Sequence, residues 1–319
     1  MTFKRLLLNC SCIAGILFSA ASLANGNWLP FPESLPKPDL SGEKLTKQWP
    51  QLTRSTMDRL PESLELQDAW RSHFEGDFAE AKEKGLALGT PEGKYVAYRA
   101  QTIYAMYLTP DPTQLSSKRD KAQRTVLLKE AYDQLSNEIR KLESAGEKPS
   151  MQLRFWSSYI FARYLEIMKS EWGLFEKKDR LTELWDALDK ISGSAADMPS
   201  LRATYGGTIA AVSEDGYLAR KTFQDRVKDC RGMEASYKDA AISQFNCALN
   251  RLGGNPVPEI MEAYATALER LGIEGGSSTT AKTSQTYRQY AAGARLPENT
   301  SQMVFMSEDI LAREAAKKL

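Results

Sequence analysis

The placement of proline constrains this chain more than any other feature of its sequence. Five of the 14 prolines fall between residues 30 and 50, whereas the stretch from 113 to 255 contains only Pro149 and Pro199. Proline removes a hydrogen bond from a helix interior but is well tolerated in the first helical turn. Long stretches with few prolines therefore predict long helices joined by short connections.

Apolar residues recur at helical spacing along these stretches. In segment 118–142 they form one stripe, with charged residues on the opposite face. Segment 153–168 is apolar nearly all round, which predicts a central helix covered on several sides. The sequence shows no alternating runs of β-branched residues that would indicate strands. We therefore expect an all-α protein whose antiparallel helix pairs stack as a solenoid or α–α superhelix.

Four segments are expected along the chain. They are a signal peptide (1–24), an extended N-terminal arm (25–40), a helical-repeat domain (41–272), and a flexible linker with short C-terminal helices (273–319). The linker contains the run GGSSTTAKTS, a composition typical of flexible chain. The last helix carries few apolar residues, so we expect it to dock loosely.

The first 24 residues have the pattern of an export signal. Lys4 and Arg5 precede an apolar run over 6–18, and Ser22 and Ala24 are small residues at the positions that a signal peptidase reads. The run is too short to span a bilayer comfortably. We predict cleavage after Ala24, no later membrane span, and export, best matched by the periplasm of a Gram-negative bacterium.

The chain contains a single histidine, His73, which excludes several chemistries. Any Ser-His-Asp or Cys-His catalytic system would have to use it, and zinc sites built on two or three histidines are impossible. A net charge of +1 gives no basic excess for nucleic acid. We find no catalytic motif, expect no metal or cofactor, and interpret His73 as a packing or surface residue.

Signal cleavage would remove Cys10 and Cys12 and leave Cys230 and Cys247. An oxidising compartment favours a disulfide between this pair. If a tight turn at 231–234 led into a straight helix, Cys247 would lie roughly 18 Å beyond it, whereas bridged Cα atoms lie within about 7 Å. A bridge therefore requires residues 231–236 to be extended and to run back along the helix.

Segment 62–89 carries small residues and a tight-turn tripeptide at the spacing of a helix pair: Ala69, Gly76-Asp77-Phe78 and Ala81. This pattern resembles one tetratricopeptide repeat, a pair of antiparallel helices of about 34 residues. It departs from the family where Gly85 replaces the usual large aromatic residue of the second helix. The resemblance implies an exported helical solenoid whose concave face binds peptides, protein segments or small molecules.

Aromatic and arginine side chains on the two central helices are the candidate binding residues. Aromatic faces stack on ligands, and a buried guanidinium needs an acid or an anionic ligand as its partner. Core packing remains the alternative interpretation of the aromatic residues. The candidates are Tyr98, Arg99, Arg154, Trp156, Tyr159 and Arg163.

Three hypotheses for function follow. The first is a non-enzymatic envelope scaffold whose groove holds a protein or peptide partner. The second is an accessory of solute transport that binds a small anionic or aromatic molecule, which a closed pocket with buried arginines would favour. The third is a cell-wall hydrolase that uses paired carboxylates, such as Asp186 with Asp189 on one helix face. Two carboxylates facing each other across a cleft would favour it.

Overall fold

The computed structural model describes residues 28–109, 118–193, 197–253, 255, 257–273, 284–293 and 306–317. Within these ranges the chain forms thirteen α-helices and one short 3₁₀ helix. The same ranges contain no strand, only an isolated antiparallel bridge between Lys228 and Glu234. The expected all-α fold with packed neighbouring helices is therefore confirmed.

The helices of the first half are α2 (Lys44–Leu52), α3 (Leu64–Glu75), α4 (Phe78–Ala87), α5 (Pro91–Tyr107), α6 (Lys118–Ser144) and α7 (Met151–Met168). Those of the second half are α8 (Leu174–Ser192), α9 (Pro199–Glu214), α10 (Tyr217–Phe223), the 3₁₀ helix η1 (Gln224–Arg226), α11 (Tyr237–Arg251), α12 (Pro258–Arg270), α13 (Ser284–Ala291) and α14 (Ser307–Ala316).

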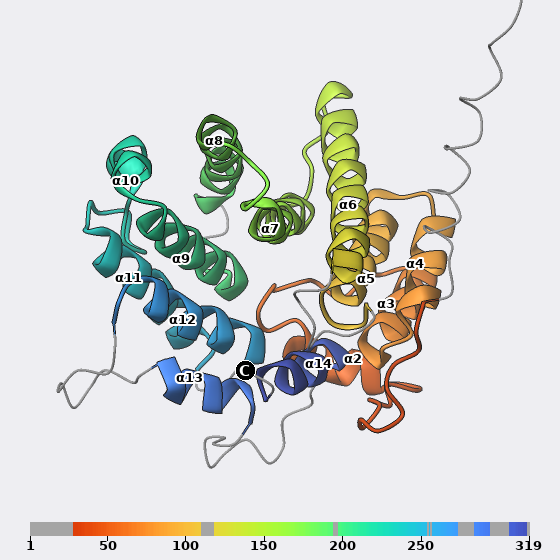
Figure 1. The fold of residues 1–319 in the computed structure, drawn as a ribbon. Helices are drawn as coiled ribbons and strands as arrows, with labels where there is room; N and C mark the ends of the chain where they lie inside the picture. The colour runs from red at the N-terminus through yellow and green to blue at the C-terminus, as the bar shows by residue number, and fades with distance from the viewer. Residues whose placement is uncertain are drawn as a thin grey trace, which may run out of the picture.

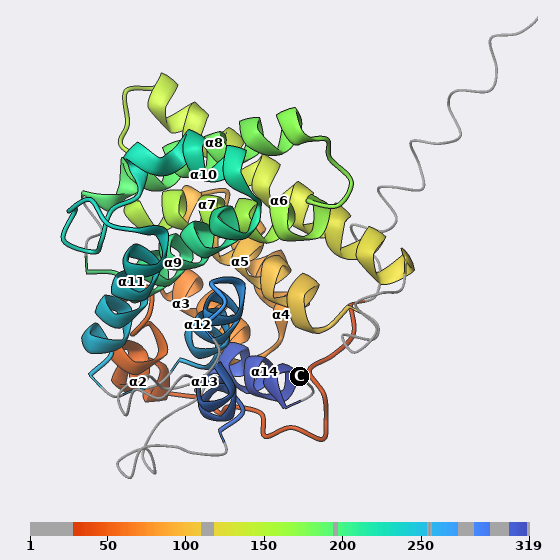
Figure 2. The same ribbon diagram turned by 60° about the vertical axis from the view of Figure 1, so that its left-hand side comes forward.

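The helices follow an arc from α3 and α4, through α5, α6 and α7, to α9, α11 and α12 (Figure 1). The last helix, α14, lies between the two ends of this arc and contacts α3 and α5 on one side and α12 and α13 on the other. The turned view shows α14 beside α13 as well (Figure 2). The C-terminal helix thus joins the first and last parts of the arc.

Capping residues start several helices where the sequence indicates. Ser63, Thr90, Ser150 and Ser236 each accept a hydrogen bond from the backbone N–H three residues later. Such a cap contributes about 1 kcal/mol, because it satisfies a donor that has no partner within the helix. These four caps begin α3, α5, α7 and α11.

The pair α3–α4 forms around glycine and alanine. Gly76 has φ +94°, the left-handed conformation that ends α3 and turns the chain into α4. Ala69 and Ala81 are fully buried in this pair. A Cβ at Gly85 would lie 2.5 Å from the backbone oxygen of Gly93, so α4 and α5 pack too closely for the aromatic residue of the repeat pattern.

The C-terminal helix is buried rather than loosely docked. Ser307 is fully buried, Asp309 is 2% exposed and Leu311 is 4% exposed. The expectation of loose docking considered only apolar surface, and the buried residues of α14 include polar and charged ones. The linker segment 274–283 lies outside the described residues, as do residues 1–27 with Cys10, Cys12 and the predicted cleavage after Ala24.

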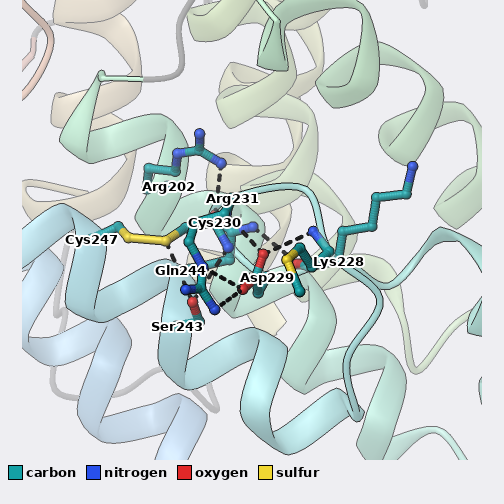
Figure 3. Close-up of a disulfide and its surroundings, with 9 residues drawn as sticks. Arg202, Lys228, Asp229, Cys230, Arg231, Ser243, Gln244 and Cys247 are labelled. Atoms are coloured by element: carbon teal, nitrogen blue, oxygen red, sulfur yellow. Dashed lines mark hydrogen bonds and ion pairs between the residues drawn. A yellow bond between two sulfur atoms is a disulfide. The ribbon is translucent and has the colours of Figure 1, made fainter.

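Cys230 and Cys247 are joined by a disulfide with a Cα–Cα distance of 6.4 Å (Figure 3). The chain before α11 lies along that helix, but it is not extended throughout as predicted: a turn at 230–232 is closed by the Gly232 N–H, which donates to the Asp229 carbonyl oxygen at 3.0 Å. The Gln244 side chain donates to the Lys228 carbonyl oxygen at 3.1 Å, and Ser243 Oγ accepts from the Cys230 N–H at 3.3 Å. These contacts hold the segment 228–230 against α11.

No helix in the described ranges is both long enough and apolar enough to cross a membrane.

Candidate functional site

A cleft of about 720 Å³ lies on the inner side of the arc between α7, α9 and α12, and residues of α5, α6, α8 and α14 also line it. Sites for small molecules usually have volumes between roughly 300 and 1,000 Å³. Besides aromatic and apolar residues, the lining contains a set of small uncharged residues and a set of charged residues.

The small uncharged set, called here the small-residue wall, comes from α9 and α14: Ser200, Ala203, Thr204, Gly207, Thr208, Ala211, Ala312, Ala315 and Ala316. Thr204 and Thr208 donate their hydroxyl protons to carbonyl oxygens four residues earlier, at 2.8 and 2.9 Å. A Cβ added at Gly207 would meet no atom within 4 Å. Short side chains therefore keep this side of the cleft open.

A second set of lining residues, called here the charged wall, comes from α7 and α12: Arg163, Glu166, Glu259, Glu262 and Arg270. Arg163 is its centre, because its two Nη atoms each donate at 2.9 Å, one to Glu166 and one to Glu259. Tyr159 Oη accepts from Arg163 Nε at 3.0 Å and donates to Glu259. The first-turn carboxylate of α12 is thus connected to two side chains of α7.

The two carboxyl groups beside Arg163 differ in pKa. Burial, reinforced by the negative charge of Glu308, raises the pKa of Glu259 to about 8. Burial acts in the same direction on Glu166, but the charges of Arg163 and Arg270 outweigh it and lower its pKa. At neutral pH, Glu259 is therefore largely protonated and Glu166 is ionised.

A buried polar cluster lies next to the cleft. Arg99, 1% exposed, donates to both carboxylate oxygens of Glu308 at 2.9 and 3.1 Å and to Asp58 at 3.1 Å. His73, fully buried, contacts Glu308 through Nε2. The Arg99 guanidinium also lies 4.8 Å from the ring centroid of Trp156, a residue of the cleft lining.

The structure brings together three of the six predicted binding residues, since Trp156, Tyr159 and Arg163 all line the cleft. Arg99 lies behind the cleft, and its anionic partners come from this chain itself. The other two lie elsewhere: Tyr98 packs near Lys82 Nζ, 6.0 Å from its ring centroid, and Arg154 forms an ion pair with Glu143 at 2.8 Å.

The carboxylates predicted as a pair, Asp186 and Asp189, both contact one guanidinium. Arg226 Nη2 lies 2.7 Å from Asp186 and 2.6 Å from Asp189. Neither aspartate lines the cleft, so the structure gives this pair an ion-pairing role on α8.

Sequence reasoning missed Gly207, Glu259, Glu262 and Arg270. Glu259 and Glu262 are three residues apart on an amphipathic helix, a spacing that also occurs on many solvated helices. Only the packing of α12 against α9 and of both against α7 gives these residues a common location. Among the described residues, no group of three or more His, Cys, Asp or Glu could hold a metal ion.

No family model, no curated protein and no solved structure matches this chain. The tetratricopeptide resemblance therefore remains a prediction.

Proposed function

We propose that this protein is an exported, non-enzymatic binding protein that holds a small molecule in the cleft between α7, α9 and α12. The observation that supports this proposal is the cleft itself, about 720 Å³ in volume and lined by small, aromatic and charged residues. Among the three hypotheses, this is the small-molecule accessory of solute transport. The position of α14 across the ends of the arc favours a ligand of limited size over a long peptide.

The charged wall supports an anionic group on the ligand. Because Glu259 is largely protonated at neutral pH, only Glu166 remains as a full negative charge within 2.9 Å of Arg163. A guanidinium in that setting can take a ligand carboxylate or phosphate as a further partner. The small-residue wall is suited to the flat or apolar body of the same ligand.

Native mass spectrometry tests the proposal on full-length protein purified from its own compartment. We expect extra mass that is released on denaturation. Gly207→Trp should abolish it, because the new side chain enters the cleft without a clash at its Cβ. Gly173→Trp is the matched control, since Gly173 also has open space at its Cβ and lies outside the cleft lining. Equal retention by both variants would contradict the proposal.

A hydrolase is the second candidate, and the unequal pKa values of Glu166 and Glu259 favour it. Most glycoside hydrolases use two carboxyl groups as their catalytic residues, one protonated and one ionised. In that case Glu259 would be the acid and Glu166 the base or nucleophile. Loss of hydrolysis of cell-wall glycan in Glu259→Gln, with glycan binding retained, would support this candidate over simple binding.

The scaffold hypothesis rests on a different surface. Phe175, at the start of α8, is 82% exposed, and Tyr217, at the start of α10, is 68% exposed. Exposed aromatic residues are common anchors for protein partners. Loss of a cross-linked envelope partner in Phe175→Ser, but not in Gly207→Trp, would favour this candidate.

A further inference from the structure

We propose that the tripeptide 307–309 at the start of α14 is an intramolecular ligand for an anion-docking site made by Arg54, His73 and Arg99, and that this docking holds α14 as a removable lid on the cleft. The docking site binds the first turn of a helix that begins with a serine followed by two acidic residues. The class of ligand that it would bind is therefore an acidic helical peptide. The lid rests on the proposed function of the cleft, whereas the docking site does not.

Glu308 occupies the centre of this docking site. Arg99 binds it in a two-pronged arrangement, with Nε 2.9 Å from Oε1 and Nη2 3.1 Å from Oε2. His73 Nε2 contacts the same Oε1 atom. A planar guanidinium that matches both oxygens of a carboxylate is a specific recognition geometry rather than a diffuse charge attraction.

The two flanking residues are recognised as well. Asp309 Oδ2 lies 2.8 Å from Arg54 Nη2, and these side chains are 2% and 9% exposed. Ser307 Oγ donates to the carbonyl oxygen of His73 at 2.9 Å. Three consecutive residues therefore each find a partner on α3, on α5 or in the segment between α2 and α3.

The cleft-facing side of α14 is poor in apolar surface. Ala312, Ala315 and Ala316 line the cleft, and a methyl group buries little area. Ile310 and Leu311 are the large apolar side chains that α14 itself buries. Docking therefore depends strongly on the polar tripeptide, because removing its acidic groups would leave the arginines buried without their charged partners.

Removal of α14 would change the cleft directly. The helix supplies three residues of the small-residue wall and also connects α12 and α13 to α3 and α5. Without α14, the cleft would lose the residues of this helix from its lining and would extend along the inner side of the arc towards α5. The small-molecule cleft would then become the longer groove expected of an open helical solenoid.

Thiol labelling at the cleft tests the lid without any ligand. In the Gly207→Cys variant the introduced thiol faces the cleft, and Cys230 and Cys247 are already joined to each other. We expect the double change Glu308→Gln with Asp309→Asn to raise the rate at which a bulky maleimide labels the introduced thiol at least about tenfold. Labelling of a Gly173→Cys control should change less than twofold. An unchanged rate at the cleft thiol, in protein with wild-type helicity by circular dichroism, would overturn the lid.

A milder variant covers the case in which the double variant does not fold. Ser307→Ala removes one hydrogen bond to α3, and we expect it to raise the labelling rate of the thiol in the Gly207→Cys background about two- to fivefold. No increase in this folded variant would also overturn the lid. Because labelling needs no bound molecule, it can succeed or fail independently of the native mass spectrometry.

The docking site is tested with a synthetic peptide of residues 306–317, labelled with fluorescein and added to full-length protein. We expect the Ser307→Ala variant to bind this peptide at least about fivefold more tightly than wild type, because its own helix competes less well. A peptide with Gln and Asn at the two acidic positions should not bind. Equal binding of both peptides would overturn the anion-docking site.

Discussion

Glu308→Gln at decreasing pH gives the sharpest test of the buried charge cluster. Burial alone would raise the pKa of Glu308, but the charge of Arg99 and the contact with His73 outweigh burial and lower it from 4.5 to about 2. A carboxyl group with a lowered pKa stabilises the folded state above its unfolded pKa, and this stability is lost as the pH falls towards the folded pKa. The relevant window therefore runs from about pH 5 down to about pH 2.

The magnitude follows from the two pKa values. Each unit of pKa corresponds to about 1.4 kcal/mol, so ionised Glu308 contributes about 3 kcal/mol at neutral pH, of which about 2 kcal/mol is lost by pH 3. Removing the charge leaves Arg99 buried without its main partner, so Glu308→Gln should cost about 3–5 kcal/mol at pH 7. At pH 3 the cost should be about 2 kcal/mol smaller, because Glu308 is then protonated in the unfolded chain but still largely ionised in the folded protein.

Urea unfolding followed by tryptophan fluorescence, at pH 7, 5, 4 and 3, measures this difference. Comparing two proteins at each pH cancels the groups that do not interact with Glu308. Asp309 and Glu259 do not cancel, because the charge of Glu308 raises the pKa of both. Glu143→Gln is the control, since Glu143 is 46% exposed in its pair with Arg154, and it should cost less than about 1 kcal/mol at every pH. A cost of Glu308→Gln that stays constant from pH 7 to pH 3 would refute the reasoning.

Three further predictions follow from other parts of the structure. Replacing Cys230 and Cys247 by serine opens a loop of 17 residues and should lower the free energy of unfolding in urea by about 3 kcal/mol. An unchanged free energy of unfolding would show that the bridge is absent from the folded protein. Gly85→Ala should lower the free energy of unfolding by about 1–3 kcal/mol, because its Cβ would lie 2.5 Å from a backbone oxygen of α5. Gly207→Ala should raise it by up to about 1 kcal/mol, because alanine favours a helix interior and its Cβ meets no atom there. A Gly85→Ala variant that melts at a higher temperature than Gly207→Ala would contradict this packing. Binding of an anionic ligand, measured by calorimetry, should weaken as the pH rises through about 8, because Glu259 then ionises and competes with the ligand for the guanidinium of Arg163. An affinity that rises above pH 8 would exclude this competition by Glu259.

Much of the fold could be predicted from local sequence. Helix starts at Thr90 and Ser150 depend on residues within one turn, and the apolar character of α7 follows from its own sequence. The inward positions of α2 are equally local, since Leu45, Trp49 and Leu52 are all buried at helical spacing. These features need no knowledge of how the rest of the chain folds.

Only the part of the candidate site that lies on α7 could be predicted from the sequence. Trp156, Tyr159 and Arg163 lie on one helix, so their shared face is visible in the sequence. Glu259 lies 96 residues after Arg163, and nothing in either local pattern indicates that the two meet. The contact between His73 and Glu308 could not be predicted for the same reason, because the two residues lie 235 positions apart in the sequence.

The docking of α14 shows why apolar content alone gave the wrong expectation for this helix. A helix at the edge of a cleft has two opposing requirements: it must be held firmly, and it must not fill the space beside it. Large apolar side chains would meet the first requirement and defeat the second. In α14 the polar tripeptide at the N-terminus supplies specific contacts to α3 and α5, while Ala312, Ala315 and Ala316 face the cleft. Anchoring by charge at one end therefore allows small residues at the other, and the cleft remains open beside a buried helix.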